Sequence, residues 1–144
     1  MKRISISEVS EKMSGMDIAI LSTHSENGEI ANRPMSNNGD VKYNGDSYFF
    51  TYEEALCVSD IERDPKVALS YSGKTGIFTG TGVYIAVEGR AELIRDKAAF
   101  QQHWTPDLDS WFDQGVETPN LVLIKVKAKR IKFWDHGDEG EAVL

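Results

Sequence analysis

The pattern of apolar and polar positions along this chain changes period sharply between residues 46 and 65. Residues 48–51 form a run rich in aromatic side chains, which have high β propensity and predict a strand. The pattern then changes to helical spacing, with Cys57, Val58 and Ile61 on one apolar side. The segment therefore predicts a strand that leads directly into a helix.

Local signals mark both ends of this helix. Thr51 and Glu54 have the T-x-x-E form of a capping box, which predicts that the helix starts just after Thr51. Asp64 precedes Pro65 and therefore avoids the helical region, which ends the helix. A helix N-terminus that follows a strand offers free N–H groups and a dipole to an anion. The same pattern also fits an ordinary strand-to-helix connection without a ligand.

The rest of the chain predicts short strands with a few helices. Ser5 and Glu8 form a second capping box, which predicts a first helix that stops at Gly15. Asn27 and Gly28 give a strong hairpin signal between two strands. Further strands are expected at 66–72, at 77–93 with breaks near Gly80 and Gly82 and a kink near Gly89, at 121–127 and at 130–134, and helical turns at 96–104 and 106–112.

These elements predict a mainly β protein built as a small antiparallel barrel with flanking helices. The length of 144 residues suits a single domain that spans 1–144, and the acidic residues 135–144 are expected to form a loose tail. The glycines of 73–82 lie between two predicted strands. They therefore predict tight hairpin turns rather than a phosphate-binding loop, which would need a strand followed by a helix.

Composition narrows the classes of function and location. The net charge of −7 argues against nucleic acid or anionic membrane as a partner. The only cysteine, Cys57, excludes an internal disulfide and fits a reducing cytoplasm. No apolar run has the length of a signal peptide or a membrane span. We therefore expect a soluble cytoplasmic protein.

The chain carries no recognisable catalytic or metal-binding motif. The three histidines, at 24, 103 and 136, have no metal-ligand spacing, so no metal site is expected. Cys57 lies on the apolar side of its helix and fits a buried structural thiol better than a nucleophile. No residue stands out as a general acid or base. Redox chemistry would therefore require a bound cofactor.

A series of short motifs resembles a known family in its order along the chain. The motifs are 32–36, 48–51, 61–65, 67–70 and 87–92, followed by Trp104, 111–115, Pro119 and 133–135. In this order they resemble the pyridoxamine 5′-phosphate oxidase-like split barrels, and the C-terminal third resembles the general stress protein 26 branch of that family.

The resemblance implies a six-stranded antiparallel split β-barrel that forms a homodimer and binds FMN, or alternatively FAD, at the dimer interface. It places the strand at 33–36 along the flavin, the start of the helix after Thr51 at the phosphate, and Trp111 on the flavin from the other subunit. The cofactor-binding residues that the resemblance implies are Arg33, Pro34, Met35, Ser36, Phe50, Thr51, Tyr52, Cys57, Tyr84 and Trp111.

Physical arguments agree with two of these assignments. Reduction places negative charge on the flavin, and the permanent charge of Arg33 would stabilise it. An aromatic ring such as Trp111 could cover one face of the flavin. An exposed surface charge remains the alternative for Arg33, and core packing remains the alternative for Trp111.

The chain departs from the family pattern at the expected phosphate site. The family carries basic residues there, whereas this chain has Ala55, Leu56 and Cys57, preceded by Glu53 and Glu54. Carboxylates oppose the binding of a phosphate dianion. Three explanations stay open: another cation such as Arg33 or Lys74 replaces the missing ones, the affinity for FMN is weak, or the site has changed or lost its ligand.

The leading hypothesis is a dimeric flavin-binding protein that transfers hydride or electrons to or from a small molecule. The alternative is a non-catalytic ligand-binding or stress-associated dimer with a degraded flavin site. True pyridoxamine phosphate oxidase activity is not expected, because the chain is shorter than those enzymes and has no Arg and His cluster near its C-terminus.

Overall fold

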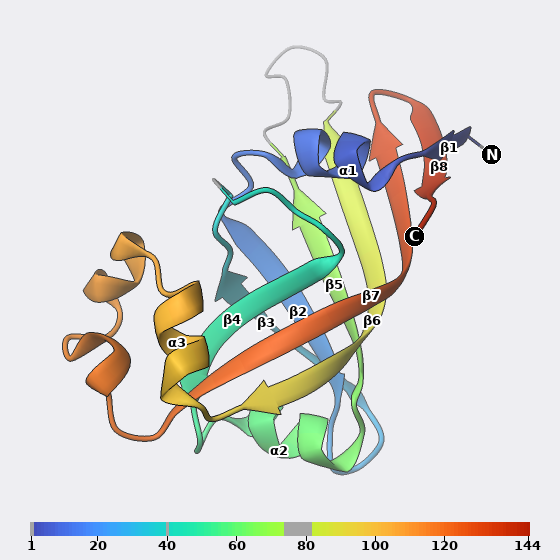
Figure 1. The fold of residues 1–144 in the computed structure, drawn as a ribbon. Coiled ribbons are helices and arrows are strands. Elements are labelled where there is room, and N and C mark those ends of the chain that lie inside the picture. Colours follow the sequence, from blue (N-terminus) through green and yellow to red (C-terminus); the bar gives the residue numbers. More distant parts are fainter. Residues whose placement is uncertain (1, 40, 74–81) are drawn as a thin grey trace.

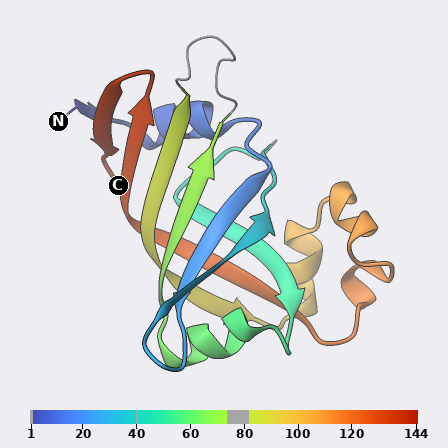
Figure 2. The same ribbon diagram turned by 180° about the vertical axis from the view of Figure 1, so that it is seen from behind.

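The computed structural model describes residues 2–39, 41–73 and 82–144. Within these ranges the chain forms one sheet that curls into an open barrel, with short helices at its ends and side (Figures 1 and 2). The strands are β1 (Lys2–Ile4), β2 (Ile18–His24), β3 (Ile30–Ser36), β4 (Asp46–Tyr52), β5 (Lys66–Ser72), β6 (Val83–Ile94), β7 (Leu121–Asp135) and β8 (Asp138–Ala142). The helices are α1 (Ile6–Met13), α2 (Leu56–Arg63) and α3 (Lys97–His103), with 3-10 turns η1 (Pro106–Ser110) and η2 (Gly115–Glu117).

Six of these strands form an antiparallel barrel in the order β3-β2-β5-β6-β7-β4. The first half of β7 pairs with β4, and its end pairs with β8, which pairs in parallel with β1. Among the described residues no strand pairs with the outer edge of β3, so the barrel is split there. The predicted mainly β, six-stranded antiparallel split barrel is confirmed, and β1 and β8 extend it by two short strands.

The bend predicted near Gly89 is present in β6. The register of β6 against β7 shifts between Glu88 and Gly89. A Cβ atom at Gly89 would lie 2.6 Å from the backbone oxygen of Lys127, so only glycine permits this close approach. The predicted turns at 73–82 and the break near Gly80 lie almost entirely outside the described residues.

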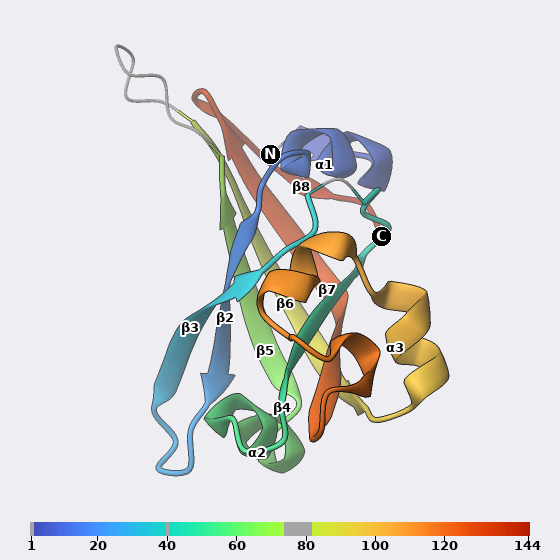
Figure 3. The same ribbon diagram turned by 90° about the vertical axis from the view of Figure 1, so that its left-hand side faces the viewer.

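Two clusters of buried side chains hold the structure together. The main core fills the barrel, where Phe49, Tyr71 and Phe133 are almost fully buried, and α1 and α2 cover its two ends (Figure 1). The second cluster includes Phe100 and Phe112 and lies between the β4–β7 pair and α3 with the 3-10 turns (Figure 3). No helix in the described part of the chain is long and apolar enough to span a membrane.

One predicted capping box is confirmed and the other is wrong. Ser5 Oγ accepts from the Glu8 N–H at 3.2 Å, and Glu8 accepts in return from the Ser5 N–H, as predicted. Helix α2, however, starts at Leu56 and has no side-chain cap. β4 continues to Tyr52, which pairs with Leu121, so the strand ladder takes the residues that the capping box of Thr51 and Glu54 would need.

The predicted loose tail is also corrected. Residues 138–142 form β8, which lies between β7 and β1. Glu141 forms an ion pair with Arg130 of β7, and Gly140 is buried against the backbone of Lys2. The strands predicted separately at 121–127 and 130–134 are one continuous strand, β7.

Candidate functional site

A hollow of about 510 Å³ lies between helix α2 and the β2–β3 hairpin. Its volume falls within the roughly 300–1,000 Å³ that is typical of small-molecule sites. Figures 1 and 2 show α2 beside the turn of this hairpin at one end of the barrel. The residues that line the hollow are Ser25, Glu26, Asn27, Ala31, Arg33, Leu56, Ser59, Asp60 and Arg63.

Helical spacing and strand pairing bring these side chains together. Leu56, Ser59, Asp60 and Arg63 recur at three- and four-residue intervals, so they share one face of α2. Arg33 lies opposite Leu21 in the β2–β3 pair, which places it next to this helix face. The site therefore depends on two segments about thirty residues apart in the sequence.

Asp60 is the buried centre of the polar network at this site. It is 4% exposed. Thr23 donates its hydroxyl hydrogen to Asp60 Oδ2 at 2.8 Å, and Arg33 Nη1 donates to the same Thr23 oxygen at 2.8 Å. Arg33 also donates to the Leu21 carbonyl at 3.2 Å, and its Nη2 lies 3.6 Å from Asp60 Oδ2. Arg33 is thus held by a buried carboxylate, a hydroxyl and a backbone carbonyl.

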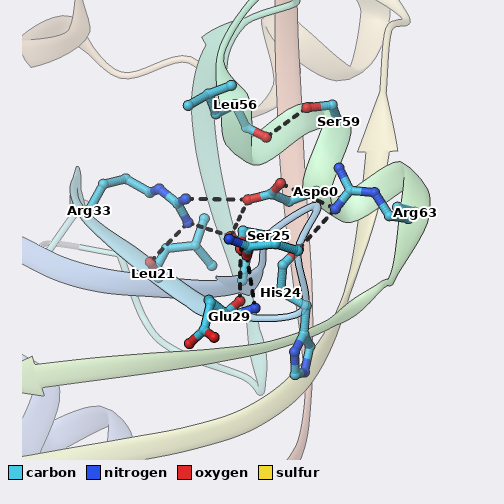
Figure 4. A network of polar contacts seen from close by, with 11 residues as sticks. Leu21, His24, Ser25, Glu29, Arg33, Leu56, Ser59, Asp60 and Arg63 are labelled. Carbon is cyan, nitrogen blue, oxygen red and sulfur yellow. Dashed lines mark hydrogen bonds and ion pairs between the residues drawn. The ribbon is translucent and has the colours of Figure 1, made fainter.

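A second arginine approaches Asp60 from the opposite side. Arg63 Nη1 lies 3.5 Å from Asp60 Oδ1 and donates to the His24 carbonyl at 3.3 Å. Figure 4 shows Arg33 and Arg63 on the two sides of the carboxylate. The side chain of Arg63 is 41% exposed, whereas that of Arg33 is 23% exposed. Solvent therefore screens the Arg63 charge more strongly.

The start of α2 presents an apolar residue to the hollow. Leu56 is 77% exposed and lines the hollow, and the helix has no acidic residue in its first turn. Cys57, which the sequence suggested as a cofactor contact, is 4% exposed and belongs to the main core. Burial raises the pKa of the Cys57 thiol, and the nearby Arg33 charge opposes that rise. Leu56, rather than Cys57, is the residue that a ligand in the hollow would meet.

The two glutamates before α2 lie outside the hollow, and Glu53 is paired with Arg95. Arg95 forms a two-pronged ion pair with Glu53 and also bonds to Glu62 of α2 at 2.8 Å. The Arg95 guanidinium lowers the pKa of the Glu53 carboxyl. Glu53 is therefore compensated by Arg95, and neither Glu53 nor Glu54 lines the hollow.

The other residues suggested on β3 and β4 lie along the split in the barrel. Ser36 and Phe50 meet around a small hollow of about 20 Å³, and Phe50 packs edge-on against Phe100 and Trp104. On β3, Met35 packs against the main core and Pro34 is exposed. On β4, Thr51 is half-buried, and the ring centroids of Tyr52 and Phe112 are 5.2 Å apart.

Tyr84 and Trp111 lie apart from this group. Tyr84 is on β6, 42% exposed, opposite Trp134 and separated from β3 by β5 and β2. Trp111 follows η1 and is 68% exposed. The second cluster leaves Trp111 out, so core packing, the alternative considered for this residue, does not apply. Neither side chain lines the hollow beside α2.

The residues around the hollow do not fit a phosphate dianion. Arg33 is already bonded to Thr23 and Leu21 and paired with Asp60, and the two arginines of the lining are matched by two carboxylates, Asp60 and Glu26. No lysine of the described part of the chain lines the hollow, and Lys74 is not among the described residues. The flavin-phosphate role implied for this corner therefore conflicts with its charges.

Sequence reasoning missed three residues of the polar network around Arg33: Thr23, Asp60 and Arg63. Asp60 interrupts the apolar side formed by Cys57, Val58 and Ile61, and a carboxylate in that position signals a buried partner. Nothing in the sequence indicates that Thr23 joins Asp60 to Arg33.

Known proteins resemble this chain in sequence and in fold. Protein bli-3 of Neurospora crassa is 26% identical over 131 residues, which cover 85% of this chain but only 60% of the length of bli-3. A Clostridium acetobutylicum protein related to general stress protein 26 shares the fold with a TM-score of 0.76, 17% identity and coverage of 94% of this chain and 92% of that one.

Two further structures share the fold and are described by their ligands. An FAD-binding protein from Mesorhizobium loti has a TM-score of 0.70 and 15% identity, with 90% of this chain and 94% of that one covered. A heme binding protein from Mycobacterium smegmatis has a TM-score of 0.75 and 12% identity, with 98% of this chain and 59% of that one covered. The sequence model for proteins described as pyridoxamine 5′-phosphate oxidase like matches residues 5–143, and this chain therefore belongs to that family.

Proposed function

We propose that this protein binds a flavin in the hollow between α2 and the β2–β3 hairpin. The observation that carries the proposal is that Arg33 and the uncapped start of α2 line one hollow of about 510 Å³. Membership of the family and the FAD-binding neighbour support a flavin as the ligand class. The sequence motifs imply FMN or FAD. The charges of the described lining, however, do not favour binding of the phosphate groups of either cofactor.

In this proposal the bound flavin supplies hydride or electron transfer to or from a small molecule. The chain contributes binding and orientation through the residues that line the hollow, among them Arg33 and Leu56. A second copy of the chain is proposed to cover the outer sheet face, where Ile18, Tyr84 and Trp134 are 53%, 42% and 37% exposed. The cytoplasmic location expected from composition is part of the same proposal.

Flavin titration of the purified protein tests this function. Saturable quenching of flavin fluorescence by the protein is expected for at least one of riboflavin, FMN and FAD. Ala31→Trp would fill the hollow and should weaken that binding about tenfold or more, because the new ring occupies ligand volume. Ile30→Trp is the matched control, because neighbouring residues of a strand point to opposite faces and Ile30 is 70% exposed.

A non-catalytic ligand-binding dimer is the second candidate. The apolar start of α2 at Leu56 and the pairing of Arg33 with Asp60 favour it, because both oppose the usual phosphate contacts. Hemin belongs in the same titration, since a heme binding protein shares the fold. Absence of saturable binding by all three flavins would reject the flavin proposal in favour of this second candidate.

A further inference from the structure

Asp60 places a negative charge where an anionic ligand of the hollow would have to bind. Its carboxylate lines the hollow and is 4% exposed. It accepts a hydrogen bond from Thr23 and lies within ion-pair distance of both Arg33 and Arg63. Each arginine therefore shares its charge with a carboxylate that belongs to the chain itself.

The charges of the lining balance without a ligand. Among the described residues of the lining, Arg33 and Arg63 are the cations, and Asp60 and Glu26 are the anions. A dianion that entered would meet a buried carboxylate of the same sign, and desolvation strengthens that repulsion. A ligand hydroxyl could instead donate to Asp60 Oδ1, which accepts a long hydrogen bond from Arg63 at 3.5 Å and has a further lone pair.

We propose that Asp60 is a built-in counter-anion of Arg33 and makes the hollow select a flavin with an uncharged polyol end, riboflavin, over FMN, which ends in a phosphate. This inference rests on the proposed flavin-binding function. It reverses the preference that a phosphate site with free cations would show.

Parallel titrations of three proteins with riboflavin and FMN test the inference. The wild-type protein should bind riboflavin more tightly than FMN. Asp60→Asn keeps the shape and the acceptor for Thr23 but removes the charge, so the ratio of affinities should move toward FMN by about tenfold or more. Glu62→Gln is the matched control: it removes one charge from the same helix, but Glu62 pairs with Arg95 and does not line the hollow. Its ratio should equal that of the wild type.

A second readout separates this inference from the flavin proposal. Inorganic phosphate, compared with chloride at equal ionic strength, should raise the melting temperature of Asp60→Asn but not that of the wild type or Glu62→Gln. If no flavin binds the wild-type protein, the proposed function fails. The role of Asp60 is then tested by the melting temperatures alone, compared with and without phosphate in the wild type and in Asp60→Asn.

Two results would overturn the inference. One is a wild-type protein that prefers FMN to riboflavin by about tenfold or more, as a phosphate-binding corner would. The other is an Asp60→Asn protein with an unchanged flavin ratio and no response to phosphate. Should Asp60→Asn fail to fold, Leu56→Arg adds a cation at a position that is 77% exposed. It should move the ratio toward FMN, and an unchanged ratio would count against the inference.

Discussion

The buried hydroxyl of Thr23 offers a direct test of the network around Asp60. Thr23 is 1% exposed, accepts from Arg33 Nη1 at 2.8 Å and donates to Asp60 Oδ2 at 2.8 Å. Valine has nearly the same shape but lacks the hydroxyl, so Thr23→Val removes both hydrogen bonds without opening a large cavity. Within the part of the chain that the structure describes, the variant leaves this buried carboxylate with its two longer ion-pair contacts, to Arg33 at 3.6 Å and to Arg63 at 3.5 Å.

The expected cost follows from these contacts. A hydrogen bond to a charged group contributes about 1.5–3 kcal/mol, and an unsatisfied buried group adds its desolvation cost. Arg33 keeps the Leu21 carbonyl and is partly exposed, so most of the loss falls on Asp60. We expect Thr23→Val to lower the free energy of unfolding by about 2–4 kcal/mol.

Urea denaturation at neutral pH measures this loss as a shift of the midpoint at constant slope. Thr23→Ser is the control: it keeps the hydroxyl, loses one methyl group and should cost about 1 kcal/mol. Combining Thr23→Val with Asp60→Asn should give a coupling energy of about 1 kcal/mol or more, since the two groups are in contact. Equal costs for Thr23→Val and Thr23→Ser would refute the network as described.

Three other predictions concern residues that do not line the hollow. Burial and the Lys125 charge lower the pKa of His103 below 6.5. The neutral ring therefore stabilises the fold fully above that pH, and the contribution is lost as the pH falls through the lower pKa of the folded state. His103→Phe should reduce the drop in unfolding free energy between about pH 7 and pH 5, and an unchanged drop would contradict this. The buried Cys57 thiol, whose pKa is raised by burial, should react with a thiol reagent about a hundredfold or more slowly in the native protein than in urea; equal rates would show that it is exposed. A Cβ at Gly140 would lie 2.1 Å from the Lys2 oxygen, so Gly140→Ala should destabilise the protein by about 1–3 kcal/mol in urea denaturation, whereas Glu139→Ala on the same strand should not.

The sequence predicted most of the fold because its local signals agree with the tertiary contacts. The hairpin signal of Asn27-Gly28 and the cap at Ser5 both appear as predicted. The same kind of cap failed at Thr51, because the pairing of Tyr52 with Leu121 extends β4 past the point where a local motif would start the helix. A local sequence motif such as Thr51 and Glu54 carries no information about a distant strand partner such as Leu121.

The site was harder to predict for a related reason. Arg33 was identified, but its partners Thr23 and Asp60 come from another strand and from a helix. Cys57 was placed at the ligand by its sequence position, yet the rotation of α2 turns it into the core and presents Leu56 and Asp60 to the hollow. The tail was expected to be loose because it is acidic, whereas Arg130 supplies the charge that its Glu141 needs in β8.

Backbone amide shifts recorded by NMR during a riboflavin titration would locate the bound flavin on the protein. If the flavin binds in the hollow beside α2, the largest shifts should fall on Ala31, Arg33, Leu56 and Ser59, which line the hollow. Saturable shifts confined to other residues, or no saturable shifts at all, would contradict binding in the hollow.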